Sequence, residues 1–325
     1  EITRWKGSCR RAPLSRHATL RASIEWSFDL ISPTEQQMLV VCAVFRSPFD
    51  TDAARAVAVA IDAGDEAVDA IQRLTDVGLL HLDDESGQYR MLHTVRQFCL
   101  EFDGAERPPR QLVDEAHARF VARWCAEVGA GDHGIEHRPF IRRMPDVVAA
   151  MAWARVNDHH AAFRMCSGLA PVRSALGHIA DFDATWRWLL AFDQADRDPV
   201  WAEAVAGLLT TATAQRFDIA SVAEQLSAYL PVGSGRGRSW LERSSAMVPA
   251  FSGRPAHIQS YADGILDRGD DLEASIYVGL AAYMLALMGR LDECHPRLEQ
   301  LRQLTRRYQT PFSVDSVGNG YAAAI

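Results

Sequence analysis

One stretch near the start of the chain constrains the fold more than any other. From Leu20 to Ile31, apolar side chains recur at the three- and four-residue spacing of an α-helix, with Ile24 and Phe28 in the same stripe and Trp26 broadening it. A helix of about four turns with one buried face is therefore predicted.

The next four residues predict where a second helix begins. In the sequence Ser-Pro-Thr-Glu at positions 32–35, Ser32 suits the N-cap, Pro33 suits the first helical position, and Glu35 can reach back to the N-cap backbone. Two helices then meet at a sharp corner. We expect the chain up to about Asp103 to form one compact domain on that corner.

The rest of this block predicts a winged helix. A short apolar helix over 37–45 is expected, then a helix from Asp50 or Thr51 to Ala60, and a third from Gly64 to about Gly78. Strand-like runs at 79–82 and 88–92 flank an acidic turn that ends in glycine, which is typical of a hairpin, and a helix follows over 93–102. The inward stripe of the third helix is predicted to consist of Val68, Ile71, Leu74 and Thr75.

The charge of this block argues against DNA binding. Residues 22–104 contain fifteen acidic residues and five arginines, a formal net charge of −10. The helix in the recognition position carries Asp65, Glu66, Asp69 and Asp76 against Arg73 alone. Binding to a phosphate backbone depends on neutralisation by lysine and arginine, so this face should repel nucleic acid.

Composition excludes several other classes of protein. No apolar run approaches the roughly 20 residues of a membrane span, and residues 1–11 lack the apolar core of a signal peptide. The six cysteines form no CxxC pair, which favours reduced, buried thiols in a cytoplasmic protein. Lys6 is the only lysine, and this excludes a phosphate-binding GK[ST] loop within the chain. No arrangement of residues suggests an enzyme.

The second half predicts stacked helical hairpins. After a proline-bearing linker over 105–109, helices are expected over 111–128, 139–157 and 159–176. Turn signals then recur near residues 177, 216, 253 and 289, at intervals of 36 to 39 residues, with alternate turns between them. Such a period indicates an α-solenoid. The run 280–293 resembles a tetratricopeptide hairpin, so we describe the repeats as TPR-like. The predicted fold class is mainly α: a winged helix with a small β-hairpin, followed by this solenoid.

Six segments carry a family resemblance. In order they are 16–30 (RHATLRASIEWSFDL), 32–36 (SPTEQ), 44–49 (VFRSPF), 89–98 (YRMLHTVRQF), 117–120 (HARF) and 147–154 (VVAAMAWA). Over roughly residues 10 to 190 the chain resembles the region after the nucleotide-binding core of bacterial STAND (NB-ARC-type) ATPase regulators of the LuxR and antibiotic-regulator-like kind. The family often has a glycine pair where this chain has Ser47 and Pro48.

The resemblance implies a nucleotide switch in the full-length protein. An ATP- or ADP-binding core is expected upstream and a LuxR-type helix-turn-helix downstream, with no cofactor held by this chain itself. In many family members, a histidine at the end of the wing contacts the β-phosphate of ADP. An ungapped match places Leu92 at that position and His93 at the next one. His93 is therefore a candidate nucleotide contact, and the alternative is an ordinary histidine near a helix start.

Four further motifs are weaker candidates. The glycine-rich run 233–238 has no lysine and follows no strand, so a flexible basic turn is the favoured interpretation. His133 and His137 have zinc-ligand spacing, but glycine interrupts the helix between them and no third ligand is near. Trp186 and Trp188 are expected to pack between repeats. Cys125 and Cys166 lack a local base and are expected to pack.

We therefore predict four segments: a remnant of the ATPase lid at 1–21, the winged helix at 22–104, a helical connector at 105–195, and TPR-like repeats at 196–325 that are truncated at their end. The predicted function is non-catalytic: the repeats bind a protein or small-molecule inducer and signal to the protein's own nucleotide-binding core. Direct contact with nucleic acid or membrane is not expected. The alternative is a stand-alone winged-helix DNA-binding repressor with a helical sensor domain.

Overall fold

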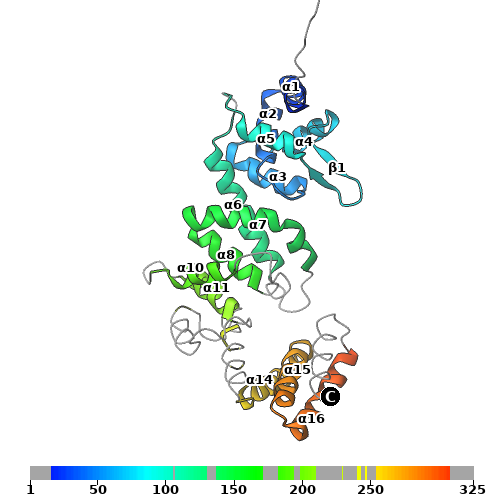
Figure 1. Cartoon of the computed structure of the whole chain (residues 1–325), viewed down its shortest axis with the longest axis vertical. Coiled ribbons are helices and arrows are strands. Elements are labelled where there is room, and N and C mark those ends of the chain that lie inside the picture. Colours follow the sequence, from blue (N-terminus) through cyan, green and yellow to red (C-terminus); the bar gives the residue numbers. More distant parts are fainter. Residues whose placement is uncertain are drawn as a thin grey trace, which may run out of the picture. The chain divides into compact units, whose positions relative to one another are not determined.

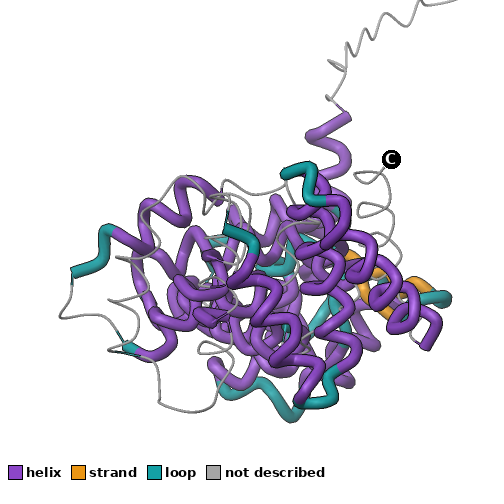
Figure 2. Tube along the Cα trace, turned by 90° about the horizontal axis from the view of Figure 1, so that it is seen from below, coloured by secondary structure: helices purple, strands orange, loops and turns teal. Residues whose placement is uncertain are grey.

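The structure, a computed structural model, describes residues 16–104, 107–129, 137–170, 182–193, 198–209 and 254–307, together with 229, 240–242 and 246. Within these residues helices prevail, and strands occur only as one two-stranded hairpin (Figures 1 and 2). The predicted mainly α fold with a small hairpin and helical repeats is confirmed. The chain divides into two compact units, one of residues 1–120 and 142–153, the other of residues 121–141 and 154–325.

The first unit contains the predicted helix corner. Helix α1 (Arg16–Asp29) is followed by α2 (Pro33–Cys42), and the capping box between them is complete. The backbone N–H of Ser32 donates to Glu35 Oε2 at 2.7 Å, and the N–H of Glu35 donates to Ser32 Oγ at 3.3 Å. Of the predicted stripe, Ile24, Phe28 and Ile31 are buried. The prediction for Trp26 is wrong, because its side chain is 66% exposed on the opposite side of the helix.

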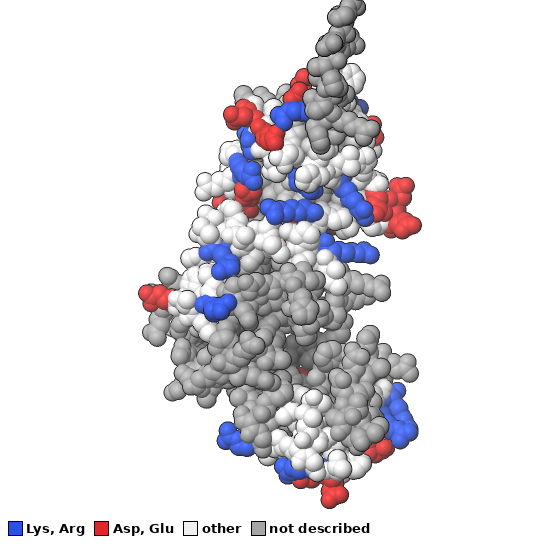
Figure 3. All heavy atoms as spheres, in the orientation of Figure 1, with Lys and Arg blue, Asp and Glu red and all other residues white. Residues whose placement is uncertain are grey.

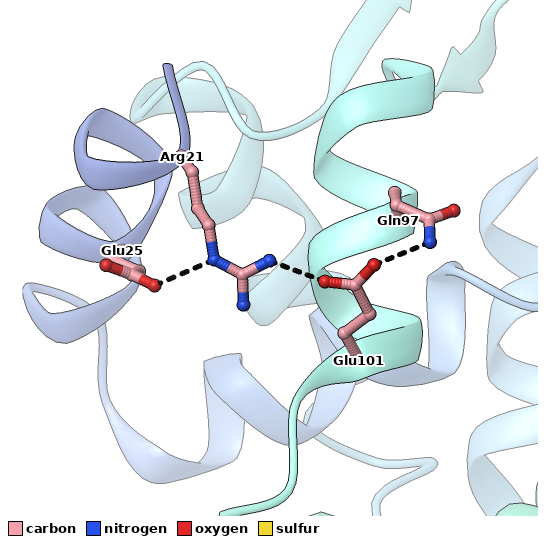
Figure 4. Close-up of polar contacts among 4 residues, drawn as sticks. All are labelled: Arg21, Glu25, Gln97 and Glu101. Atoms are coloured by element: carbon pink, nitrogen blue, oxygen red, sulfur yellow. Dashed lines mark hydrogen bonds and ion pairs between the residues drawn. The ribbon is translucent and has the colours of Figure 1, made fainter. Parts of the chain in front are cut away.

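An ion pair ties α1 to α5 (His93–Glu101), as Figure 4 shows. Arg21 donates to Glu25 on its own helix at 3.2 Å and to Glu101 on α5 at 2.5 Å. The amide of Gln97 donates to the other oxygen of Glu101 at 2.7 Å. Hydrogen bonds from Gln97 and then Arg21 hold the pKa of Glu101 below its ordinary value. The bridge is exposed and adds one contact between the two helices, and Phe28 of α1 also packs against Phe98 and Phe102.

The capping box gives a first testable prediction. Replacing Ser32 with Ala removes the acceptor for the Glu35 N–H, which should lower the free energy of unfolding by about 1 kcal/mol. Urea denaturation followed by circular dichroism measures the change. Ser23→Ala is the matched control, because Ser23 lies inside α1 and caps no helix. Equal losses in the two variants contradict the capping role. The other half of the capping box depends on pH: the Ser32 backbone N–H lowers the pKa of Glu35, so the stability that the Glu35 carboxylate contributes is lost as pH falls through that lowered pKa.

Three short helical elements follow the corner. Asp50 accepts the Ala53 N–H at 2.7 Å and caps α3 (Thr51–Ala58), which runs into a 3-10 turn, η1 (Val59–Ile61). Helix α4 (Ala67–Asp76) buries Ala67, Ala70, Ile71 and Leu74. The predicted inward position of Val68 is wrong, because its side chain is 53% exposed and small alanines form the contact instead. Gly78 ends this segment with a φ of 76°, a left-handed conformation that favours glycine.

The predicted wing is present. Strand β1 (His81–Asp83) pairs antiparallel with β2 (Gln88–Arg90), and Leu82 lies opposite Tyr89. Phe49 forms a further antiparallel bridge to Tyr89, and its N–H donates to the Tyr89 carbonyl at 3.1 Å. This third contact anchors the hairpin to the loop before α3. Buried apolar side chains of α1 to α5 form one core beneath it, which also takes in Val113 of α6 (Arg110–Val128).

Helices α6 and α7 (His137–Asn157) each contribute residues to both units. In the first unit, the segment before α6 packs on the winged helix: the Arg107 guanidinium donates to the carbonyls of Phe102 and Leu100, and Pro108 is buried. The carbonyls left open at the end of α5 thus find donors. The predicted linker at 105–109 is, in its described part, a packed connection.

The second unit begins with a close helix contact. Helix α8 (His159–Leu169), capped by Asp158, approaches α6 so closely that Gly168 meets the Cys125 backbone directly. Helices α10 (Phe182–Leu190) and α11 (Pro199–Leu209) follow. Trp188 packs edge to face against Phe192 and lies under the Arg155 guanidinium at 5.0 Å, a packing role as predicted. Trp201 is buried and donates to the Leu189 carbonyl.

Three antiparallel helices form the last described segment: α14 (Ala256–Asp267), α15 (Asp271–Leu287) and α16 (Leu291–Arg307), drawn in yellow to red in Figure 1. Turns at Gly269 and Gly289, with φ of 80° and 71°, join them. These confirm the helical hairpin predicted over 280–293 and the turn before α15. The turn signals near 177, 216, 231 and 309 lie outside the described residues.

Candidate functional site

The helix in the recognition position of the winged helix presents an acidic surface. Asp65 and Glu66 precede α4, Asp69 and Asp76 lie on it, and all four are exposed. Its one arginine, Arg73, is exposed, and its Nε lies 3.4 Å from Glu35 Oε1, so an acidic group already offsets part of its charge. The side of this helix that a DNA-binding winged helix would place in a groove therefore offers carboxylates rather than guanidinium groups.

The tip of the hairpin has the same character. Asp83 accepts the N–H groups of Glu85 and Ser86 at 3.1 and 3.2 Å and pairs with Arg90 at 3.1 Å. The Ser86 N–H, more than any other group, lowers the pKa of Asp83. Asp84 and Glu85 are exposed at the turn. The hairpin projects its acidic atoms at the right edge of Figure 3. Both elements by which a winged helix ordinarily contacts DNA are thus negatively charged.

His93 is the one nucleotide contact suggested by the sequence, and the structure places it at the surface. It is the first residue of α5, whose N-cap Leu92 provides no side-chain hydrogen bond to the helix. The first N–H groups of α5 lack a side-chain cap and form a partial positive charge there. Contact of His93 with a nucleotide stays a prediction.

The structure also shows a cavity of about 190 Å³ in the first unit that sequence reasoning missed. Four arginines line it: Arg46 after α2, Arg96 on α5, Arg107 before α6 and Arg110 on α6. One carboxylate, Asp114 of α6, also lines it, and the rest of the lining includes Cys99, His117, Trp153 and apolar residues. The arginines come from three separate segments, because Arg107 and Arg110 lie together just before and at the start of α6, and no local sequence motif predicts the group.

Beside the cavity lies a polar group buried without access to water. Asp146 of α7 is 0% exposed, and its Oδ1 accepts the Arg46 backbone N–H at 2.6 Å. His117 Nε2 lies 3.4 Å from the same oxygen. Asp146 Oδ2 and His117 Nε2 have no hydrogen-bond partner among the described residues. Because a buried carboxylate left unpaired is costly, the negative charge of Asp146 depends on the surrounding cations.

The described cysteines are buried, and the described histidines are not gathered around them. Cys42, Cys99, Cys125, Cys166 and Cys294 are buried free thiols, as predicted. Burial raises the pKa of Cys99 and of Cys166 to about 12, so both stay protonated and weakly nucleophilic. Among the described residues, no three histidine, cysteine or acidic side chains are grouped as a metal site would require. His133 and the run 233–238 lie outside the described residues, and so do the side chains of His137 and Trp186.

Comparison with known proteins gives a partial match. Three proteins of Mycobacterium tuberculosis and Mycobacterium bovis, provisionally named HTH-type transcriptional regulators, are 32% identical to the chain over 179 residues. The match covers 53% of this chain but 20% of the relatives, so the chain spans about a fifth of their length. An uncharacterized Mycobacterium tuberculosis protein is 36% identical over 91 residues, 26% of this chain and 22% of that protein. No family model and no solved structure matches.

The lengths and polarity of the described helices can be compared with those of membrane spans. In the part of the chain that the structure describes, every helix is either too short or too polar to cross a bilayer.

Proposed function

We propose that this chain is a non-catalytic part of a larger bacterial transcriptional regulator of the STAND kind. In this proposal, helical hairpins of the second unit bind an inducer or a protein partner. The acidic winged helix then passes the signal to a nucleotide-binding core elsewhere in the same protein, in the cytoplasm. The observation that carries the proposal is a winged helix whose recognition face is acidic. The similarity to regulators several times longer than the matched stretch supports it.

The acidic face favours a contact with protein over one with DNA. A helix that presents Asp69 and Asp76, with Arg73 engaged by Glu35, repels phosphates and suits a basic protein surface. The stand-alone repressor is therefore the weaker alternative. Binding to an operator, in the proposed arrangement, is the task of a helix-turn-helix in another part of the longer regulator.

An electrophoretic mobility shift assay tests this assignment. At about 0.15 M salt, the full-length regulator should retard its own promoter fragment, whereas the present chain should retard neither that fragment nor unrelated DNA. A variant in which Asp65, Glu66, Asp69 and Asp76 are all replaced by Asn controls for the acidic face. If weak, salt-sensitive DNA binding appears in this variant alone, the repulsion is due to these four carboxylates. Submicromolar binding by the unaltered chain would overturn the proposal.

Nucleotide binding supplies an independent test. In the full-length protein, His93→Ala should weaken ADP binding by roughly 10-fold if the imidazole reaches a phosphate, the loss expected for one hydrogen bond to a charged group. His81→Ala, an exposed histidine on β1, is the matched control and should leave the affinity unchanged. An ADP affinity unaffected by His93→Ala removes His93 from the nucleotide site, while leaving the regulatory proposal intact.

A further inference from the structure

The arginine-lined cavity of the first unit contains more positive charge than its own residues neutralise. Four guanidinium groups line it against a single lining carboxylate, Asp114. Asp114 is already engaged, because Arg110 Nε donates to its Oδ2 at 3.3 Å. Arg107 is engaged too, since its guanidinium donates to the carbonyls of Phe102 and Leu100. Arg46 and Arg96 therefore determine the charge left in the cavity.

Neither of these two guanidinium groups forms a direct ion pair with a carboxylate of the described residues. Among the described residues, no ion pair or hydrogen bond engages the Arg46 or Arg96 guanidinium, and the Nε of Arg96 is buried without an acceptor. Asp146 lies behind them: its Oδ1 accepts the Arg46 backbone N–H and lies 3.4 Å from His117 Nε2, and its charge acts on Arg96 without a hydrogen bond. Burial lowers the pKa of Arg96, the charge of Asp146 raises it, and the positive charge of Arg46 lowers it to a smaller extent. Arg96 is half-buried and Arg46 is exposed, so the cavity places two like charges near one another, one of them partly desolvated.

Such an arrangement is unfavourable without a counter-charge. Guanidinium groups pair with carboxylate or phosphate in a planar, two-pronged geometry, and a desolvated donor that lacks an acceptor costs free energy. A single carboxylate neutralises only one of the two charges. A dianionic phosphate group can neutralise both positive charges. Its oxygen atoms accept hydrogen bonds from several directions, which suits two guanidinium groups that come from α5 and from the segment after α2.

From this geometry we propose that the cavity binds free phosphate or the phosphate group of a small monoester, with Arg46 and Arg96 as its principal ligands. Arg107 and Arg110 also line the cavity and add to its positive charge, and His117 is a buried part of the lining. A volume of about 190 Å³ is below the roughly 300 Å³ at which cavities for drug-sized ligands begin, so the occupant is compact. The site lies wholly within the first unit and does not depend on the nucleotide switch proposed above.

Bound phosphate would also connect elements that are far apart in the sequence. Arg46 follows α2, Arg96 lies on α5, and the opposite wall belongs to α6 and α7. A ligand that draws the two arginines together stabilises this arrangement by mass action, because it binds only the folded unit. Occupancy therefore becomes a small-molecule input to the winged helix that is separate from any inducer bound by the repeats.

Isothermal titration calorimetry of the whole chain tests the proposal. Inorganic phosphate and glycerol phosphate are titrated at constant ionic strength, with chloride and acetate as the comparison anions. Phosphate should bind, and acetate should bind at least about 10-fold more weakly. Arg96→Gln and Arg46→Gln should each weaken phosphate binding by roughly 10- to 100-fold, the loss expected for a hydrogen-bonded charged pair. Tighter binding of glycerol phosphate than of free phosphate identifies a monoester as the ligand class.

The matched control is Arg55→Gln, which removes the same charge from an exposed position on α3 of the same unit, where Asp65 lies 3.8 Å away. It should leave phosphate binding unchanged. Circular dichroism checks that each variant is folded, and Arg96→Lys provides a second variant that keeps the charge. Absence of phosphate binding by the unaltered chain overturns the proposal. An equal loss in Arg55→Gln also overturns it, because that result means general charge attraction rather than a site.

Discussion

Phe45→Ala should lower the free energy of unfolding of the first unit by about 3–5 kcal/mol, the usual cost of emptying a large aromatic site in a packed core. Phe45 is fully buried. Its ring stacks on Phe49 with centroids 4.6 Å apart and meets the rings of His117 and Phe120 edge to face. The side chain thus joins the loop that supports the wing to helix α6. A loss of this size is a large part of the 5–15 kcal/mol that stabilises a typical domain.

Chemical denaturation of the whole chain, followed by circular dichroism, measures this effect as a shift of the transition midpoint. Trp26→Ala is the matched control. It removes an even larger aromatic ring, but from a position that is 66% exposed, and should change the free energy by no more than about 0.5 kcal/mol. A comparable loss in the two variants would mean that α1 buries Trp26 in solution, contrary to the structure.

Local signals in the sequence were sufficient for the elements of the winged helix. The capping box at Ser32 and Glu35 and the glycine-ended acidic turn at 83–87 each determine a boundary by contacts within a few residues. Those boundaries could be predicted because no distant residue takes part. Gly289 marks its turn for the same reason, since a left-handed φ is inexpensive only for glycine.

The directions of single side chains were harder to predict. Trp26 and Val68 are apolar residues that extend a stripe in the sequence, yet both are exposed. Trp26 lies about half a helical turn from Ile24 and Phe28, and on α4 small alanines form the buried contact instead of Val68. Helical periodicity identifies a face of about 100° but does not state how closely the partner helix approaches. That depends on tertiary packing.

The arginine-lined cavity could not have been predicted from local patterns. Arg46 and Arg96 are fifty residues apart, and each looks like an ordinary surface arginine in its own segment. Only the packing of α2, α5, α6 and α7 brings them to one cavity. Asp146, a hundred residues from Arg46 in the sequence, accepts the backbone N–H of Arg46. The net charge of residues 22–104 is negative. A net charge does not show that positive side chains are concentrated at one place in the fold.

Gly168→Ala should destabilise the second unit by about 3 kcal/mol or more, the upper end of the cost of overpacking, because the obstacle is backbone rather than a flexible side chain. A Cβ at Gly168 would lie 2.2 Å from the Cys125 carbonyl oxygen and 2.4 Å from its carbon. Helices α6 and α8 must therefore separate to accept one methyl group. Gly264→Ala is the control: this glycine lies inside α14 with no atom within 4 Å of the added Cβ, so the change should stabilise the helix by about 0.5–1 kcal/mol. Denaturation midpoints that move in opposite directions support the close contact between α6 and α8. A neutral Gly168→Ala would instead show that the two helices are farther apart than the structure places them.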